Sequence, residues 1–380
     1  MSSDCAPLSG IRIIEIAHML AGPYCGMLLA DLGAEVIKIE TGAGDISRST
    51  GFHYVGGHNV YFASLNRNKK SIRLNLSDAA DLETFHRLVS TAQGVVTNLR
   101  PRAIAKLGLT YDTLRRYNPK IVCVAVTGFG LSGPYSDSPA YDYIIQAMAG
   151  VMLLAGDPGG PPVRAGYSVV DNTGGMMAGL GLMAKMLSGK GGQVDIALYD
   201  VMLSQLNYLA AAYLNASEEP VRHPSGGHSF FVPAQIFRTL DGYLALFITH
   251  DEFWTIFATE LQRPDWLTDE RFATMHARSK NRDVVTGAIS DELRQKPTAE
   301  WINRLRPLGL VIAGVATLAE ALADPRTIVR NMIATLPTTD GPLKLLGNPI
   351  KIEGFEENYE PPPRLGEHDP VYASSLLVDN

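Results

Sequence analysis

The alternation of short β-branched runs with longer helical patterns over the first 200 residues is the feature that most constrains the fold. Strands that alternate with helices build a parallel sheet with helices on both faces. We therefore predict an α/β fold with a Rossmann-like parallel sheet. The predicted strands cover residues 11–17, 34–40, 70–76, 94–98, 120–128 and the run 191–200.

The pattern changes from about Asp171 onward. Helical segments over 174–187 and 201–214 are apolar nearly all round, which predicts buried helices. A turn-rich break over 217–229 follows, and then a β-hairpin is predicted to turn at Asp241-Gly242. Helices with charged faces come after it, as in a small α+β domain.

A chain of 380 residues exceeds the size at which a single core stops growing, so two domains are expected. The changes in pattern place the boundaries. We expect a large Rossmann-like domain over 1–222, a smaller α+β domain over 223–331, and a C-terminal segment over 332–380 that returns to the large domain.

Charge and composition exclude several classes of function. The net charge is −6, so no overall basic field attracts nucleic acid or an anionic membrane. Three scattered cysteines (Cys5, Cys25 and Cys123) and nine histidines without an H-x-x-x-H pair predict no disulfide framework and no metal site. We see no signal peptide, and the most apolar run, 143–156, is shorter than the ~20 residues that span a bilayer. A soluble, cytoplasmic protein is expected.

Gly128, Gly130 and Gly133 have the G-x-G-x-x-G spacing of a dinucleotide-binding turn. Such a turn needs a helix directly after its third glycine. Here Pro134 and loop sequence follow, and the next helical pattern begins only near Tyr141. The spacing therefore predicts a ligand-lining loop and not a nicotinamide site.

Two basic clusters, 66–73 and 98–106, flank predicted strands of one sheet. They are either two solvated faces or parts of one site for a polyphosphate, as in a nucleotide-like ligand.

Asp171 stands at the start of a long apolar helix, with Gly174 and Gly175 just behind it. One interpretation is a structural N-cap. The other is an ionised carboxylate at a positive helix end, where adjacent glycines let a substrate approach. Such a carboxylate can act as a nucleophile toward an activated acyl group.

Taken in order, several motifs resemble the class III (CaiB/BaiF-type) CoA-transferases, a family that includes formyl-CoA and acetyl-CoA:oxalate transferases and related racemases. The resemblance covers nearly the whole chain. Its motifs are residues 7–40, Gly44-Asp45 with Arg48, 65–72, 98–109, 128–150, 170–175, 191–200 and 346–352.

The resemblance implies that Asp171 is the catalytic residue. It would attack an acyl-CoA thioester to give a mixed anhydride, then an aspartyl-CoA thioester, and an acceptor acid would reverse the sequence. Gly226 and Gly227 correspond loosely to a loop whose N–H groups would stabilise oxyanions. The implied substrates are acyl-CoA and small, dicarboxylic or polar, acids, and the implied assembly is an interlocked homodimer.

The resemblance also implies contacts to coenzyme A. Two departures from the family stand out: Leu20 replaces a glutamine of some members, and Thr41 replaces an arginine of many. Arg48, Lys69 or Lys70 would then supply the missing cation. The implied contacts are Leu20, Ala21, Arg48, Leu74, Asn75, Leu76, Asn98, Leu99, Arg100, Lys106 and Tyr141.

Two other functions compete with transfer. The racemase branch has a histidine before an aspartate where this chain has Tyr141-Asp142, and tyrosine, with a pKa near ~10, is a poor acid–base group at neutral pH. A non-catalytic CoA-binding subunit would not need Asp171 and the glycine pair. Residues that could meet a second substrate carboxylate, or serve only structure, are His18, Arg164, Arg222 and His228.

Overall fold

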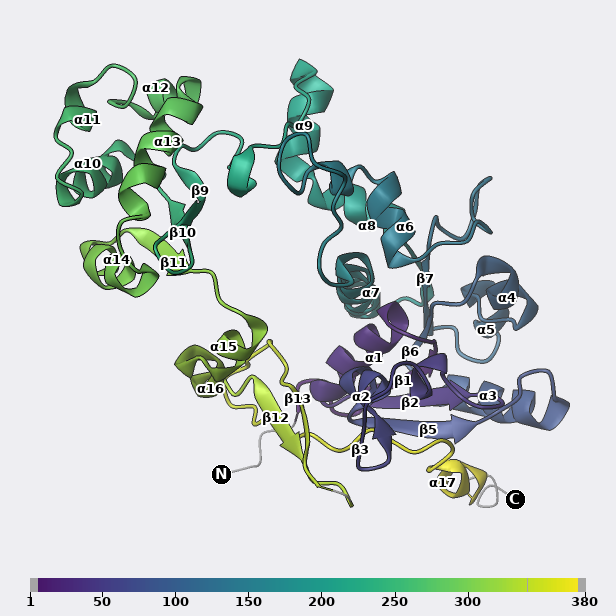
Figure 1. Ribbon diagram of the computed structural model, residues 1–380. Helices are drawn as coiled ribbons and strands as arrows, with labels where there is room; N and C mark the ends of the chain where they lie inside the picture. The colour runs from purple at the N-terminus through teal and green to yellow at the C-terminus, as the bar shows by residue number, and fades with distance from the viewer. Residues whose placement is uncertain (1–5, 340, 375–380) are drawn as a thin grey trace. The chain divides into compact units, whose positions relative to one another are not determined.

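The computed structural model describes residues 6–339 and 341–374, which form two compact units (Figure 1). The larger unit comprises the chain up to residue 149, residues 166–206, and the chain from residue 324 onward. The smaller unit comprises residues 150–165 and 207–323. The chain thus passes through the smaller unit twice.

A six-stranded parallel sheet forms the centre of the larger unit, with the strand order β5-β2-β1-β6-β7-β8. Counted along the chain, this is the 3-2-1-4-5-6 order of the doubly wound Rossmann fold, so the predicted parallel sheet is confirmed. The third strand ends three residues earlier than predicted, which leaves residues 74–76 beyond it. The strands are β1 (Arg12–Ile16), β2 (Glu35–Glu40), β5 (Lys69–Arg73), β6 (Gly94–Thr97), β7 (Val122–Thr127) and β8 (Gly192–Ala197).

Helices cover both faces of this sheet. Helices α1 (Ala21–Asp31) and α7 (Val169–Leu187) pack together on one face. On the other face, α3 (Ala79–Thr91), α4 (Pro101–Lys106) and α5 (Tyr111–Leu114) enclose a core of aliphatic side chains. The larger unit also contains α2 (Val60–Asn66), α6 (Asp142–Met148), α8 (Leu198–Gln205) and α16 (Pro325–Val329), a 3-10 helix η1 (Ile46–Arg48), and the short strands β3 (Tyr54–Val55) and β4 (His58–Asn59).

The C-terminal segment lies along the sheet edge at β5. It begins with a hairpin of β12 (Ile333–Leu336) and β13 (Leu343–Leu346) and ends in α17 (Asp369–Ser374). His368 N–H donates to the carbonyl of Ser71 at 3.0 Å, and the Asp369 carboxylate pairs with Arg73 at 2.8 Å. These contacts tie the last described part of the chain to the larger unit.

The smaller unit is α+β, with an antiparallel sheet in the order β11-β10-β9. The predicted hairpin is confirmed: Thr239 and Gly242 close the turn between β9 and β10. The core contains Trp254 and Trp266, stacked at 5.5 Å. Its elements are η2 (Val151–Leu153), α9 (Asn207–Ala216), η3 (Pro224–Gly226), β9 (Ala234–Arg238), β10 (Tyr243–Phe247), α10 (Asp251–Glu260), α11 (Asp265–Thr268), α12 (Met275–Lys280), α13 (Arg282–Leu293), α14 (Thr298–Leu305), η4 (Arg306–Leu308), β11 (Val311–Gly314) and α15 (Leu318–Ala323).

The prediction of two fully buried helices is wrong within this chain. The predicted helix over 201–214 is divided between α8, which buries Val201 and Met202, and α9, which has no buried residue. Helix α7 exposes Met176, Leu180 and Leu187. A helix that is apolar on all sides is normally buried against other protein surface, but the sequence pattern does not show whether that surface belongs to the same chain. Cys25 and Cys123 are buried thiols, and Cys5 lies outside the described residues. Among the helices that the structure describes, none has the length and hydropathy required to cross a membrane.

Candidate active site

A cavity of about 230 Å³ opens at the carboxyl ends of the central strands, where the strand order reverses between β1 and β6. Ligands of doubly wound folds bind in this crevice because the loops of neighbouring strands diverge there. The loops after β1, β6 and β7 all contribute to its wall. The lining residues are His18, Met19, Leu20, Ala21, Tyr61, Asn98, Leu99, Arg100, Pro101, Val126, Thr127, Gly128, Ser136, Ser138, Ala140, Tyr141, Asp171 and Leu198.

Asp171 is the third residue of α7 and lies in the wall of this cavity. Its carboxylate accepts no hydrogen bond from any residue that the structure describes. Burial, helped by the negative charge of Asp142, raises the pKa of Asp171 to about 7. The Asp171 carboxylate is therefore more basic than an ordinary aspartate, and burial opposes the ionised form that we expected at the helix start.

The residue that caps α7 is Asp142, not Asp171. One carboxylate oxygen of Asp142 accepts the Val170 N–H at 2.8 Å and the Asp171 N–H at 3.4 Å. The other oxygen accepts from the side chain of Gln146 at 2.7 Å. Helix N-termini need acceptors for these N–H groups, and the local residue Ser168 provides none through its side chain. The cap thus comes from a residue 28 positions before Val170 in the chain.

Gly174 and Gly175 serve helix packing and do not open space for a substrate. A Cβ on Gly174 would lie 2.4 Å from Leu198, and a Cβ on Gly175 would lie 2.6 Å from the carbonyl oxygen of Ala21. Their absent side chains let α7 approach α1 and α8 closely. The expectation that these glycines admit a substrate is therefore wrong, and their effect on Asp171 is to fix the first turns of its helix.

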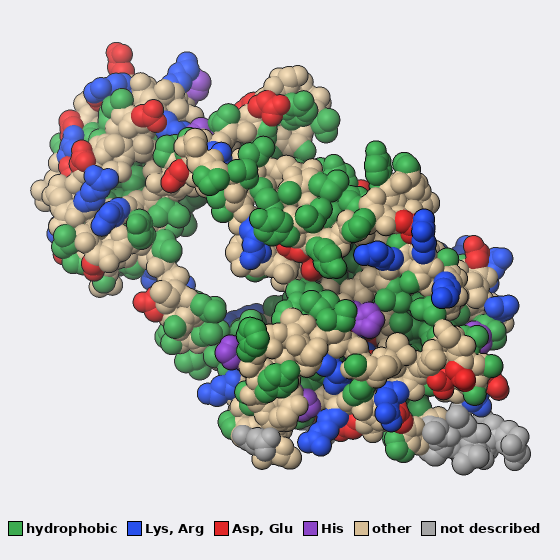
Figure 2. Space-filling model, turned by 45° about the vertical axis from the view of Figure 1, so that its right-hand side comes forward, with side chains coloured by type: hydrophobic (Ala, Val, Ile, Leu, Met, Phe, Trp, Pro, Cys, Tyr) green, Lys and Arg blue, Asp and Glu red, His purple; other side chains and the backbone are tan. Residues whose placement is uncertain are grey.

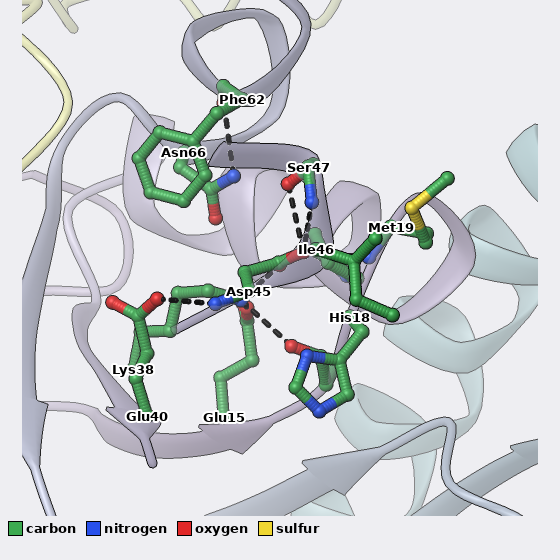
Figure 3. A network of polar contacts seen from close by, with 12 residues as sticks. Glu15, His18, Met19, Lys38, Glu40, Asp45, Ile46, Ser47, Phe62 and Asn66 are labelled. Carbon is green, nitrogen blue, oxygen red and sulfur yellow. Dashed lines mark hydrogen bonds and ion pairs between the residues drawn. The ribbon is translucent and has the colours of Figure 1, made fainter. Parts of the chain in front are cut away.

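Side chains from other elements hold the cavity loop after β1. The Asn98 amide accepts the His18 N–H at 2.9 Å and donates to the His18 carbonyl at 2.8 Å. Asp45 accepts the N–H of Met19 at 3.1 Å, as Figure 3 shows. Met19 has a positive φ of 63°, which a non-glycine residue adopts only when its surroundings impose it. The wall opposite Asp171 is thus held at three backbone groups.

Asp45 belongs to a network of buried charges on the α1 face of the sheet (Figure 3). Lys38 pairs with Glu15 at 2.7 Å and with Asp45 at 2.9 Å, and Lys69 pairs with the other oxygen of Glu15 at 2.7 Å. All four side chains are fully buried. Desolvation lowers the pKa of Lys69 to about 8. Each charge has a partner, as buried charges require.

This network corrects the interpretation of the basic cluster at 66–73. Two of its cations are used inside the fold: Lys69 in the network, and Arg67 in a buried pair with Asp31 at 2.6 Å. Neither provides a solvated face or an open phosphate site. The proposed substitutes for the cation absent at Thr41 are also engaged, since Arg48 binds Glu40 at 2.6 Å and Lys70 binds Glu35 at 2.6 Å.

Three further polar groups complete the cavity. Burial lowers the pKa of His18, and its Nδ1 is buried without a hydrogen-bond partner among the described residues. The Tyr61 pKa is raised by burial and by the charge of Asp171. Arg100 is exposed and carries the cation of the 98–106 cluster that lines the cavity. The sequence analysis did not name Tyr61, Ser136 or Ser138, although both serines lie in the family motif over 128–150.

The structure brings together seven of the predicted site residues: Leu20, Ala21, Asn98, Leu99, Arg100, Tyr141 and Asp171. Others of the larger unit are not among the described cavity-lining residues. Leu74 is buried in the core, Leu76 packs against that core, and Asn75 and Lys106 are exposed. The guanidinium of Arg48 faces Glu40.

Gly226 and Gly227 belong to the smaller unit, at the end of η3. Gly226 has a φ of 67° and lines a groove of about 370 Å³ with His228 and residues of β9, β10 and β11. The His228 Nδ1 accepts the N–H groups of Phe230 and Phe231. Arg222 donates to three backbone carbonyls of the same unit, so its charge serves a loop.

A family model described as CoA-transferase family III matches residues 8–369. The chain belongs to this family. This CoA-transferase is 34% identical to the acetyl-CoA:oxalate CoA-transferase of Acetobacter aceti, over 95% of this chain and 93% of that protein. It is 35% identical to the succinate–glutarate CoA-transferase of Agrobacterium fabrum, over 97% and 96% of the two chains. A CaiB/BaiF family protein from Brucella suis has the same fold, with a TM-score of 0.86, 32% identity, and coverage of 97% and 99%.

Proposed function

We propose that this CoA-transferase moves coenzyme A from an acyl-CoA donor to a small dicarboxylic acid, with Asp171 as the covalent nucleophile and the cytoplasm as its compartment. The main support for this proposal is the position of Asp171 in the cavity. Its carboxylate lies without hydrogen-bond partners among the described residues, in the cavity where the strand order reverses. Carboxylates that form covalent intermediates need this access.

The first half-reaction transfers CoA to the enzyme. The Asp171 carboxylate attacks the thioester carbonyl carbon of the donor, the C–S bond breaks, and CoA leaves as the thiolate. The thiolate then attacks the aspartyl carbonyl of the resulting mixed anhydride. The donor acid leaves as a carboxylate, and Asp171 holds CoA as a thioester. The energy of the thioester is kept in a covalent bond.

The second half-reaction repeats these steps in reverse. The acceptor carboxylate attacks the aspartyl thioester, which releases the thiolate and forms a second anhydride. The thiolate attacks the acyl carbon of the acceptor, and the Asp171 carboxylate is restored. Each oxyanion that forms requires hydrogen-bond donors. The sequence candidates for this role, Gly226 and Gly227, belong to the smaller unit, and the Gly227 N–H donates to the Pro224 carbonyl at 3.2 Å.

The acceptor is proposed to be a dicarboxylic acid because the relatives above are named for oxalate, succinate and glutarate. Within the cavity, Arg100 is the exposed cation, and Tyr61 and His18 are neutral hydrogen-bonding groups. The CoA phosphates carry most of the substrate charge. We propose that Arg100 meets a phosphate and that Tyr61 and His18 face the acyl group.

We also propose that the enzyme is a homodimer. Helix α7 exposes Met176, Leu180 (65% exposed) and Leu187 (83% exposed), and apolar side chains are visible on the molecular face in Figure 2. Contiguous exposed apolar surface marks an interaction site. Size-exclusion chromatography with light scattering tests this proposal, and a monomer at micromolar concentration contradicts it.

Trapping the intermediate tests the covalent mechanism. Incubation with acetyl-CoA or succinyl-CoA, followed by hydroxylamine, should convert Asp171 to a hydroxamate that peptide mass spectrometry detects. The variant Asp171→Ala should abolish transfer and leave CoA affinity within a few-fold. Turnover without any modified Asp171 peptide would rule out the mechanism. A panel of oxalate, succinate, glutarate and monocarboxylic acids identifies the acceptor.

We do not propose racemisation, because a tyrosine, Tyr141, stands where the racemase branch has its histidine, and its side chain is exposed at the cavity. Incorporation of solvent deuterium at the α-carbon of a branched acyl-CoA would reverse this assignment. A non-catalytic subunit is equally disfavoured, since such a subunit has no use for a basic carboxylate in an open cavity.

A further inference from the structure

The carboxylate of Asp142 lies at the start of α7, beside the first turn that carries Asp171. Asp142 is 8% exposed, and one of its oxygens accepts both the Val170 and the Asp171 N–H groups. These N–H groups are the positive end of α7. In most helices a side chain at the N-cap position would accept them, and an acidic residue of the first turn such as Asp171 would share their stabilisation.

We propose that Asp142 is a positioning residue of the transfer reaction: it holds the first turn of α7, takes the helix-end donors away from Asp171, and places a like charge behind the nucleophile. The inference rests on the proposed function of Asp171. Burial is the main reason that Asp171 is more basic than an ordinary aspartate, and the like charge of Asp142 adds to it. A basic, accessible carboxylate suits attack on a thioester carbonyl.

A buried side chain in turn holds the carboxylate of Asp142 in place. Gln146, one turn further along α6 and fully buried, donates to the second oxygen of Asp142 at 2.7 Å. The Asp142 carboxylate therefore accepts hydrogen bonds at both oxygens. Asp171 has none from the described residues, so the two aspartates are in opposite environments. Pairs of carboxyl groups with such different environments divide roles between them.

Among the described residues, few titratable side chains face Asp171 from the neighbouring elements. Asp142 and Tyr141 come from α6 and its N-cap, Tyr61 from α2, His18 from the loop after β1, and Arg100 from the loop after β6. Of these, Asp142 contributes a carboxyl group and Arg100 a guanidinium group. Burial and the charge of Asp142 are what raise the pKa of Asp171 to about 7.

The variant Asp142→Asn tests the proposal because the amide oxygen still accepts helix N–H groups while the negative charge is gone. The acid limb of the pH profile of kcat/KM should move to lower pH, since Asp171 then loses its proton more readily. The value of kcat at about pH 8 should fall several-fold, since a less basic carboxylate is a weaker nucleophile.

Asp78→Asn is the matched control. Asp78 also accepts two N–H groups at a helix start, those of Ala80 and Asp81 in α3, but it does not line the cavity. Its pH profile should equal that of the wild type. His18→Gln is a second control, and it should leave the acid limb in place if Asp171 is the titrating group.

Two outcomes separate the inference from the proposed function. If the wild type forms the hydroxylamine-trappable Asp171 adduct, and Asp142→Asn keeps the wild-type acid limb, the role of Asp142 is refuted and the nucleophile stands. If the wild type never forms the adduct, the proposed function falls first. Where Asp142→Asn unfolds at assay temperature, Asp142→Ser provides the test: its hydroxyl can accept a helix N–H while the negative charge is gone, so its acid limb should also move to lower pH, and an unmoved limb refutes the role of Asp142.

Discussion

Replacing Asp171 by asparagine should abolish transfer and make the folded protein more stable at alkaline pH. The carboxylate costs stability because it is half-buried beside a second carboxylate. Its pKa rises from an ordinary value near ~3.9 to about 7 in the folded protein. At about 1.36 kcal/mol per pH unit, ionising it in the folded state costs up to about 4 kcal/mol.

The sign of the effect follows from the direction of this pKa change. Below about pH 4, Asp171 is protonated in both the folded and the unfolded protein, so it costs nothing. As the pH rises to 7, the unfolded chain loses the proton before the folded one does, and the folded state becomes less stable. Above pH 7 the full cost is present. Because Asp171 is only partly buried, we expect a gain of about 1–3 kcal/mol for Asp171→Asn at about pH 8.

Thermal unfolding of the wild type and Asp171→Asn at about pH 8 and about pH 4.5 measures the effect. The difference between their midpoints should be large at the higher pH and shrink at the lower one. Asp78→Asn serves as control, because Asp78 is an exposed cap of α3 outside the cavity and should not show that pH dependence. Equal midpoints of the wild type and Asp171→Asn at both pH values would refute the reasoning, since a carboxylate that costs nothing is not strained by its site.

Other substitutions test the packing, the buried charges and the cavity cation. Gly175→Ala should lower stability by about 1–3 kcal/mol and reduce kcat, because a Cβ would lie 2.6 Å from the Ala21 carbonyl oxygen. Thermal unfolding and steady-state rates measure these effects, and unchanged values would contradict the close packing. Lys69→Ala should cost about 3–5 kcal/mol, because it leaves Glu15 with an unpaired buried oxygen; a denaturation midpoint equal to the wild type contradicts this. Arg100→Ala should raise the KM for acyl-CoA and weaken its salt dependence with kcat nearly unchanged, whereas a fall in kcat alone would place Arg100 at the reacting atoms.

Local sequence was sufficient for most strands and for the start of one helix. The β-branched runs at 11–17 and 120–128 are strands within two residues of the predicted bounds, because a run buried on both faces admits few other conformations. The loop after Gly133 is also as predicted, since α6 begins at Asp142. Motif order along the chain was enough to indicate the family that the comparison then showed.

Charged residues within the strands carried a signal that we did not use. Glu15, Lys38 and Lys69 occupy positions of one parity in neighbouring strands of a sheet covered on both faces. Charges at such positions must pair inside the fold, since water does not reach them. The pairing of cations with anions depends on strand order, and no single segment of the sequence predicts strand order.

The amino-acid sequence by itself determined the alternation of strands and helices, the family, and the presence of a carboxylate where an apolar helix starts. Only the tertiary structure decided what surrounds that carboxylate. The order of the strands brings the loops at 18–21 and 98–101 to Asp171, and it sets Asp142 against the first turn of α7. Cavity, cap and basicity all arise between segments distant in the chain, because a carboxylate takes its pKa from the charges and the water around it in space.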